Sequence, residues 1–272
     1  MSVTPSKTAG SVAQGNTVSS PYDSKEYLTG LERGLSVLLA FNQDHRQLTL
    51  ADIARAVGLP RATARRAVNT LEHLGFLANE GRLFRLTPKV LMLASAYATS
   101  NQVTTLLQPA CEQLSREFDE DCSAAVFDGG QAVRIAHASP PRLVSMVPGI
   151  GFRLPAYCTA LGRALLSQMP EDELQTLLVS HPPQRLTPYT ELDPGRIRLA
   201  VRRVATDGYA LVDREAEEGF RSIAVPIANA NGRVVAALNI GVRVDTTSLD
   251  AMRERFLPRL RAIAHDLRRQ LL

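Results

Sequence analysis

The side chains best suited to binding another molecule are gathered in one short basic segment. Residues 61–69 read RATARRAVN, and the candidate contact residues there are Arg61, Ala62, Thr63, Arg65, Arg66 and Asn69. An arginine can donate two hydrogen bonds to the edge of guanine or clamp a phosphate, and an asparagine suits adenine. The small residues near its start would let the segment approach the floor of a groove. These residue types indicate contact with double-stranded DNA.

Catalytic and metal-binding chemistry is not indicated elsewhere in the chain. The five histidines lie far apart and form no zinc-binding pattern, so we interpret them as surface or internally satisfied residues: His45, His73, His137, His181 and His265. No G-x-S-x-G nucleophile elbow occurs. The acidic run over residues 117–121 is typical of a solvated helix end, because a calcium loop needs spaced ligands and a central glycine. We therefore expect no catalytic residues, no metal site and no cofactor.

The cysteines leave one alternative open. Cys111, Cys122 and Cys158 are an odd number without C-x-x-C spacing, which argues against a disulfide framework and a structural zinc site. Cys158 lies near a predicted helix start, where the pKa of a thiol can fall. We favour a small buried residue at this position, with a redox sensor as the alternative.

Charge is distributed unevenly along the chain. The net charge is +4, and residues 1–90 carry eleven Lys and Arg against seven Asp and Glu, whereas the remainder carries twenty of each. A basic module joined to a neutral one fits a nucleic-acid-binding domain with a second function attached. No run of about eighteen apolar residues predicts a membrane span, and the first residues lack the apolar core of a signal peptide. We expect a cytoplasmic protein with a disordered tail over residues 1–25.

The basic segment lies in a predicted helix-turn-helix. Thr49 is placed to N-cap a first helix, Gly58 can end it, and Pro60 suits the first turn of the second. In the second helix one apolar face is formed at helical spacing by Ala64, Ala67, Val68, Leu71 and Leu74. The arginines and Asn69 then occupy the opposite face and the first turn.

Two flanking elements favour DNA binding over an ordinary αα-hairpin with solvated arginines. Residues 76–88, FLANEGRLFRLTP, predict two short strands around a basic tip that includes Arg82, which is typical of a wing. Before the helix-turn-helix, leucines recur at helical spacing and predict a helix with one stripe facing inward: Leu31, Leu35, Leu38 and Leu39.

The remainder predicts a linker and an α+β domain. The linker helix has apolar residues on more than one side, which suits either packing against a partner or a plain connection. Beyond it we expect an amphipathic helix over 106–118 and a hairpin turning at residues 128–130. A strand near 143–148, three helices, three strands and a closing helix over about 248–272 follow. The predicted domains are a tail (1–25), a winged helix-turn-helix (26–88), a linker helix (89–102) and a C-terminal domain (103–272).

At this point the chain resembles the IclR family of bacterial transcription regulators. The resemblance rests on RGLSVLLAF, LADIARAVGLPRATARRAVNTLEHLGFL and FRLTP in the N-terminal part, and on RLPAYCTALGRALLS, DREAEEGFRSIAVPI and AALNIGV in the C-terminal part. It implies a winged helix-turn-helix, a linker helix and a GAF/PAS-like effector-binding domain. Within the family, IAHASPPR and the two longer C-terminal blocks look closest to the protocatechuate and 4-hydroxybenzoate regulators of the β-ketoadipate pathway.

The resemblance also implies where the sites lie. DNA would be contacted by the residues of segment 61–69 named above, by Thr49 and by Arg82. Residues matching the effector-binding blocks are Tyr157, Cys158, Thr159, Ala160, Leu161, Asp213, Ser222, Asn239 and Gly241. Backbone N–H groups at the helix start near Thr159 could hold a carboxylate. Arg134 could pair with a ligand carboxylate, or form an internal ion pair instead.

The leading hypothesis is therefore a transcription regulator whose operator binding is controlled by a small carboxylate. The expected effector is an aromatic acid or a β-ketoadipate-pathway intermediate, with a short aliphatic acid as the alternative. Expected partners are operator DNA, the effector, further copies of the chain as a dimer or dimer of dimers, and RNA polymerase, but no membrane. A Cys158 redox sensor and a small-molecule enzyme are the rival hypotheses.

Overall fold

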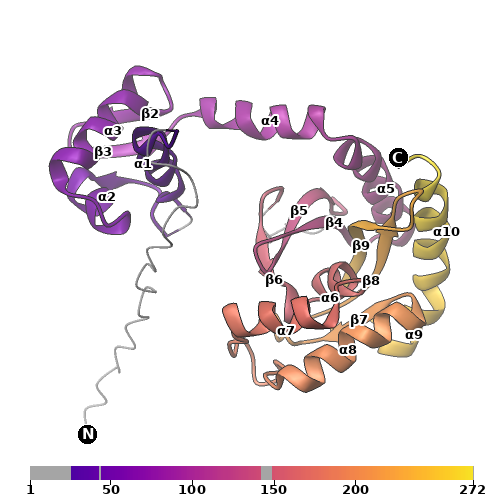
Figure 1. Cartoon of the computed structure of the whole chain (residues 1–272). Helices are drawn as coiled ribbons and strands as arrows, with labels where there is room; N and C mark the ends of the chain where they lie inside the picture. Colours follow the sequence, from indigo (N-terminus) through magenta and orange to yellow (C-terminus); the bar gives the residue numbers. More distant parts are fainter. Residues whose placement is uncertain (1–25, 43, 142–148, 272) are drawn as a thin grey trace, which may run out of the picture. The chain divides into compact units, whose positions relative to one another are not determined.

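The computed structural model describes residues 26–42, 44–141 and 149–271 (Figure 1). The tail expected at 1–25 and the strand expected near 143–148 lie outside the described residues. The chain divides into two compact units, one ending at Leu93 and the other beginning at Ala94. Among the described residues, no helix is long and apolar enough to cross a membrane.

The N-terminal unit packs three helices against a small antiparallel sheet. The helices are α1 (Thr29–Leu39), α2 (Leu50–Ala56) and α3 (Arg61–His73). The strands β1 (Leu48–Thr49), β2 (Leu77–Glu80) and β3 (Leu83–Leu86) form a sheet in the order β1-β3-β2. Val37, Ile53, Val68 and Leu77 lie in its core. The predicted winged helix-turn-helix is thus confirmed, with β1 as a strand that the sequence did not indicate.

Local sequence determines the turn between α2 and α3. The Thr49 side chain accepts a hydrogen bond from the backbone N–H of Asp52, and the Asp52 carboxylate accepts one from the backbone N–H of Thr49, which forms a capping box. Gly58 adopts φ 64°, a left-handed conformation that glycine reaches without a Cβ penalty. Pro60 occupies the N-cap of α3, one position before its predicted place in the first turn.

The inward leucine stripe predicted for the first helix is wrong in most of its positions. Val37 is the buried residue of α1, whereas Leu31, Leu35 and Leu39 are 61%, 48% and 82% exposed. The helix packs on α3 through its Val37 side, where Leu38 is partly buried, while Leu31, Leu35 and Leu39 remain exposed among the described residues. Helical periodicity identifies an apolar face but not the partner that covers it.

The boundary between the two units falls within one helix, and a second helix follows it. Residues 88–90 form a short 3-10 turn, and α4 (Leu91–Ser100) follows with no buried residue. The Asn101 side chain then accepts hydrogen bonds from the backbone N–H groups of Val103 and Thr104, which caps α5 (Gln102–Phe118). A helical linker was predicted over 89–102.

The C-terminal unit is built on one six-stranded antiparallel sheet in the order β6-β5-β4-β9-β8-β7. Its strands are β4 (Asp121–Asp128), β5 (Gln131–Ala138), β6 (Arg153–Pro155), β7 (Ala210–Asp213), β8 (Phe220–Ala228) and β9 (Val234–Arg243). The β4–β5 hairpin turns at Gly129–Gly130, as predicted, and its register shifts between Ala124 and Ala125. The α+β class is confirmed.

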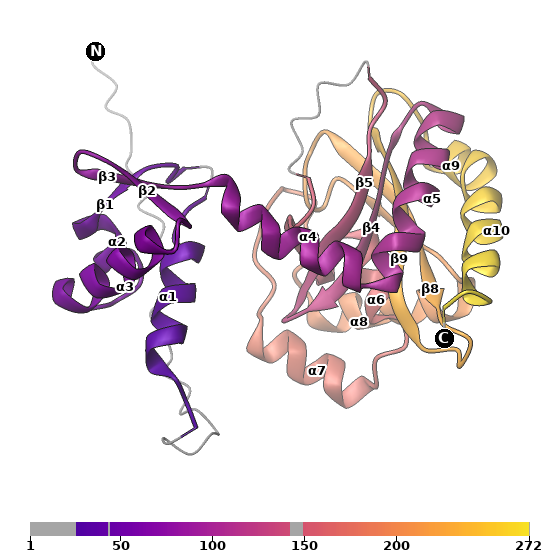
Figure 2. The ribbon, with the colours of Figure 1, turned by 90° about the horizontal axis from the view of Figure 1, so that it is seen from above.

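Helices cover both faces of this sheet (Figure 2). One face packs on α5, α9 (Leu249–Arg255) and α10 (Leu257–Arg268), and its core contains Cys111 and Cys122. The other face packs on α6 (Ala160–Leu166), so we call it the α6 face. Helices α7 (Glu171–Ser180) and α8 (Pro194–Asp207) contribute to a third cluster, which contains Cys158.

The single closing helix predicted over 248–272 is wrong. The structure has two helices, α9 and α10, which meet at Phe256 and Leu257, and the second ends at Arg268. Pro258 lies in the first turn of α10. Proline lacks the N–H needed for a continuous ladder, and its ring collides with the carbonyl four residues earlier, so the helix is interrupted there.

Candidate DNA-binding and effector-binding sites

Helix α3 separates its apolar and polar residues onto opposite faces. Ala64, Val68 and Leu71 are buried, whereas Leu74, predicted to lie with them, is half exposed. The polar face is exposed along its length, with Thr63 intermediate: Arg61, Ala62, Arg65, Arg66 and Asn69. The buried face fixes the helix in its unit, so the arginine face is presented to solvent.

The arginines of this face are available to an external anion. Within the described residues, Arg61, Arg65, Arg66 and Arg82 form no ion pair with an acidic side chain of the chain. Arg82 lies exposed in the β2–β3 turn, beside Gly81. Thr49 is engaged in its capping box, where its Oγ1 also donates to Asp52 Oδ2 at 2.6 Å. Thr49 therefore orients α2, while the arginines carry the unpaired charge.

Strand alternation gathers several predicted effector residues on the α6 face. Ser222 lies opposite Gly241, and Ala224 lies opposite Asn239, on adjacent strands. Asn239 Oδ1 accepts hydrogen bonds from the backbone N–H (3.2 Å) and the Oγ (2.8 Å) of Ser123 on β4. Successive side chains of a strand point to opposite faces, and Ala224 belongs to the cluster under α6. Ser123, Ser222 and Asn239 therefore lie on that face, and we call them the polar row.

Arg134 supplies a buried cation on the same face. It is 7% exposed, it pairs across the hairpin with Ala125 of the α6-face cluster, and its guanidinium lies over the Phe152 ring at 5.7 Å. Burial lowers the pKa of Arg134, and the negative charge of nearby Asp121 opposes that shift.

The start of α6 is fixed tightly beside this face. Thr159 caps the helix by accepting a hydrogen bond from the N–H of Gly162 at 3.1 Å, and Ala160 and Leu161 pack against the sheet. A Cβ on Gly162 would lie 2.2 Å from the Ala156 carbonyl oxygen, so only glycine fits this approach. The sequence predicted that the first N–H groups of this helix could hold a carboxylate. The helix has only seven residues, and the Gly162 N–H already donates to Thr159, so fewer N–H groups remain for a ligand.

Three predicted effector residues are not brought to the polar row. Tyr157 and Cys158 pack in the third cluster with α7 and α8, and the Tyr157 hydroxyl donates to the Gln184 carbonyl at 2.6 Å. Asp213 alternates with Val212, which is in the α6-face cluster, so it lies on the other face and forms an ion pair with Arg221 at 2.9 Å. Strand parity and loop packing turn these three side chains away from the row.

Sequence reasoning missed three residues that do lie on the α6 face. Asp121 begins β4, His137 lies near the end of β5, and Ser139 follows it. Asp121 had been interpreted as part of a solvated acidic helix end, yet its side chain is only 14% exposed. The alternation of Asp121 with Ser123 along the strand could have indicated that both lie on one face. No local pattern, however, encodes the shift in hairpin register that aligns His137 with them.

These three residues include a serine, a histidine and an aspartate, but their geometry is not that of a hydrolase triad. The Ser139 hydroxyl donates to Asp121 Oδ2 at 2.7 Å, and His137 Nε2 lies 3.0 Å from the same oxygen and 3.1 Å from Ser139 Oγ. A triad needs one ring nitrogen for the serine and the other for the carboxylate. Here one nitrogen faces both, and the serine proton is directed at the carboxylate.

The thiols are buried. Burial raises the pKa of Cys158 to about 12 and that of Cys111 to about 12, and it raises the pKa of Cys122 as well. No group of three or more His, Cys, Asp or Glu that could hold a metal ion occurs among the described residues.

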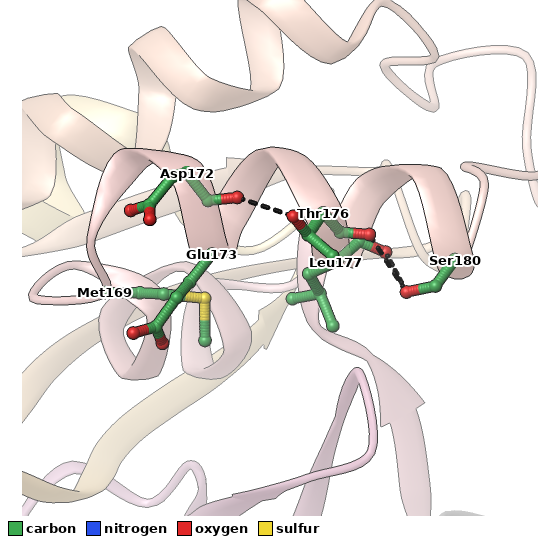
Figure 3. A pocket seen from close by; sticks show the side chains of 6 residues that line it. All are labelled: Met169, Asp172, Glu173, Thr176, Leu177 and Ser180. Carbon is green, nitrogen blue, oxygen red and sulfur yellow. Dashed lines mark hydrogen bonds between the residues drawn. The ribbon is translucent and has the colours of Figure 1, made fainter.

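A hollow of about 340 Å³ on the outer surface of α7 contains none of the predicted site residues (Figure 3). Its lining comes from one helix and the residue before it: Met169, Asp172, Glu173, Thr176, Leu177 and Ser180. Two hydroxyls of this lining already bond to the helix backbone, Thr176 to Asp172 and Ser180 to Leu177. The hollow therefore offers little with which to bind a carboxylate.

Comparison with known proteins assigns the N-terminal and C-terminal parts of the chain to the same family. A family model described as the IclR helix-turn-helix domain matches residues 30–81. A second, described as the C-terminal part of the bacterial transcriptional regulator IclR, matches residues 95–269.

Several characterised relatives match most of the chain. The Pca regulon regulatory protein of Pseudomonas putida is 39% identical, over 90% of this chain and 85% of that protein. The p-hydroxybenzoate hydroxylase transcriptional activator of Acinetobacter baylyi is 32% identical, over 90% of this chain and 92% of that protein. The predicted subgroup resemblance is confirmed by these relatives.

A solved structure extends the similarity to the fold. An IclR homolog from Microbacterium hydrocarbonoxydans, complexed with 4-hydroxybenzoate, superimposes with a TM-score of 0.74 at 27% identity, covering 88% of this chain and 97% of that one.

Proposed function

This chain belongs to the IclR family of bacterial transcription regulators, and from that premise we propose that it binds operator DNA through α3 under the control of a small aromatic carboxylate. The observation that carries the first part is the exposed arginine face of α3. Arg61, Arg65 and Arg66 are turned to solvent by the burial of Ala64, Val68 and Leu71, and they have no acidic partner among the described residues. A helix so placed can enter the major groove while Arg82 of the wing contacts a phosphate.

The proposed effector site is the α6 face of the sheet, where the buried Arg134 can pair with a carboxylate. Support for an aromatic acid comes from the relatives: one is an activator named for p-hydroxybenzoate hydroxylase, and one homologous structure holds 4-hydroxybenzoate. A short aliphatic acid is the alternative for the same fold.

Self-association is part of the proposal. The uncovered leucines of α1 are accompanied by exposed apolar residues on α4, namely Leu91, Met92, Leu93 and Tyr97. Exposed apolar surface of this kind marks an interaction site. A second copy of the chain is the partner we propose, because two DNA-reading heads then match a palindromic operator.

Operator binding by variants of α3 tests the function. Replacing Arg65 and Arg66 with alanine should weaken operator affinity at least tenfold and reduce the slope of log affinity against log salt by about 2, since each arginine that neutralises a phosphate releases about one counterion. Fluorescence anisotropy over a salt series measures both quantities, and titration at high concentration gives the number of chains per operator.

Arg116→Ala on α5 is the matched control, because Arg116 is an exposed arginine of the C-terminal unit. It should leave affinity and salt slope unchanged. If the Arg65/Arg66 variant behaved like this control, α3 would not be the recognition helix.

A further inference from the structure

A hydrogen-bonded group of three side chains forms one end of the α6 face. Ser139 Oγ donates to Asp121 Oδ2 at 2.7 Å, and His137 Nε2 lies 3.0 Å from Oδ2 and 3.2 Å from Oδ1. Two donors therefore fix the orientation of one carboxylate, whose side chain is 14% exposed. A carboxylate held in this way presents its remaining acceptor positions in a fixed direction.

The position of this group follows from the sheet register. Asp121 lies opposite Gly241 and Ser123 lies opposite Asn239, so the carboxylate continues the polar row toward the end of the sheet. At the other end, Gln168 after α6 bonds to the backbone of Gly232 and Val234 in the β8–β9 hairpin. The end of α6 is thus fixed at the hairpin end of the sheet, and its first turn packs on Ala156, whose N–H donates to the Gly130 carbonyl at that same end.

The α6 face has a cationic side chain, Arg134 opposite Ala125, and an anionic one, Asp121, at its polar end. Arg134 is the buried cation on the strands of this face, and Asp121 is close enough that its charge opposes the lowering of the Arg134 pKa by burial. An acid bound with its carboxylate at Arg134 would direct its remaining polar group at a surface that includes Asp121. A hydroxyl there can donate a hydrogen bond, whereas a second carboxylate would meet a like charge.

We propose that Asp121, oriented by His137 and Ser139, is a specificity-determining residue that accepts a hydrogen bond from a hydroxyl of the effector. The site then takes a hydroxylated monocarboxylic acid in preference to the same acid without its hydroxyl and to a dicarboxylic acid. This inference rests on the proposed effector site and deepens it. A site built to pair a hydroxyl rejects the analogue that lacks it, because its own acceptor loses a partner.

Titration calorimetry of the full-length protein with 4-hydroxybenzoate, benzoate and adipate tests the inference. The wild-type chain should bind 4-hydroxybenzoate at least tenfold more tightly than benzoate or adipate. In Asp121→Asn, which keeps the size of the side chain and removes its charge, the ratio of 4-hydroxybenzoate to benzoate affinity should fall to within about threefold, mainly through weaker binding of the hydroxylated acid. Ser139→Ala should reduce the ratio by less, because Ser139 only positions the carboxylate.

Asp128→Asn is the control, since Asp128 is an exposed carboxylate at the opposite end of the same strand, paired with Arg153. It should leave the ratio unchanged. Equal wild-type affinities for 4-hydroxybenzoate and benzoate, or tighter binding of adipate, would overturn the inference while leaving a carboxylate effector in place. An unchanged ratio in Asp121→Asn would also overturn it. Binding of none of the three acids would overturn the aromatic effector itself. The comparison of the three acids in the wild-type chain tests the inference even if a variant fails to fold.

Discussion

Among single residues, Cys158 is a thiol that could be oxidised, but its surroundings make it unreactive. It is fully buried, and burial raises the pKa of its thiol to about 12. The thiolate is the reactive form, and a pKa near 12 leaves about one molecule in 100,000 deprotonated at pH 7. A redox sensor needs a lowered pKa and access to oxidant, and this residue has neither.

We therefore expect Cys158→Ser to respond to peroxide as the wild-type chain does. Operator affinity, measured before and after exposure to peroxide at pH 7, should be equal in the two proteins within experimental error. A loss of affinity in the oxidised wild type that is absent from Cys158→Ser would reinstate the redox hypothesis.

Individual residues also show how far sequence reasoning reaches. Thr49 and Gly58 were placed correctly because a cap and a left-handed turn depend on a few neighbouring residues. The sequence did not indicate that Asp213 and Tyr157 lie away from the other predicted effector residues, because the face on which a side chain lies depends on the register of distant strands and on loop packing. Asp121 and His137 are sixteen positions apart in the sequence, and only the folded hairpin joins them.

Among the elements, the start of α6 depends on one close contact. Gly162 approaches the backbone of Ala156, and the neighbouring Arg163 donates to the Tyr157 carbonyl at 2.9 Å and forms a buried ion pair with Glu215 at 2.7 Å. These interactions fix the helix to the loop before it and to the loop after β7.

Gly162→Ala should destabilise the C-terminal unit by about 1–3 kcal/mol, because an added Cβ forces the helix away from a backbone that cannot yield. Urea denaturation followed by circular dichroism measures this change. Gly219→Ala is the control, since a Cβ there meets nothing within 4 Å, and it should alter stability much less. Equal stabilities in the two variants would show that α6 tolerates displacement.

For whole elements, periodicity was sufficient to identify almost every helix and strand, and its failures have physical causes. The closing helix breaks at Pro258, and most of the α1 stripe is exposed because none of the described residues packs on it. Periodicity reports that a face is apolar but contains no information about what it packs against.

At the scale of the whole molecule, the proposed control of DNA binding needs a contact between the α6 face and the helix that follows α4. Gln108 on α5 offers a direct connection. Its Oε1 accepts from the His137 N–H at 3.0 Å, and its Nε2 donates to the His137 carbonyl at 3.1 Å. The residue that touches Asp121 is thereby tied through its backbone to the helix that follows α4.

Gln108→Ala should preserve effector affinity within about twofold but reduce the effector-induced change in operator affinity several-fold, because coupling requires a contact that differs between the two states. Measuring operator affinity with and without effector gives the coupling. Gln113→Ala, an exposed glutamine of the same helix, is the control. Retention of full coupling in Gln108→Ala would assign transmission to other contacts.

The burial of all three cysteines has a practical consequence for observing the protein at work. Cys111 and Cys122 lie beneath the face covered by α5 and α10, and Cys158 lies in the cluster formed with α7 and α8. A thiol reagent can reach them only when the corresponding layer opens, so the rate of modification at each cysteine reports the opening free energy of its own layer. The native chain thus contains two internal probes of opening, one in the core beneath α5 and α10 and one in the cluster formed with α7 and α8. Comparing their rates with and without effector would reveal which layer the ligand tightens, without any added label or mutation.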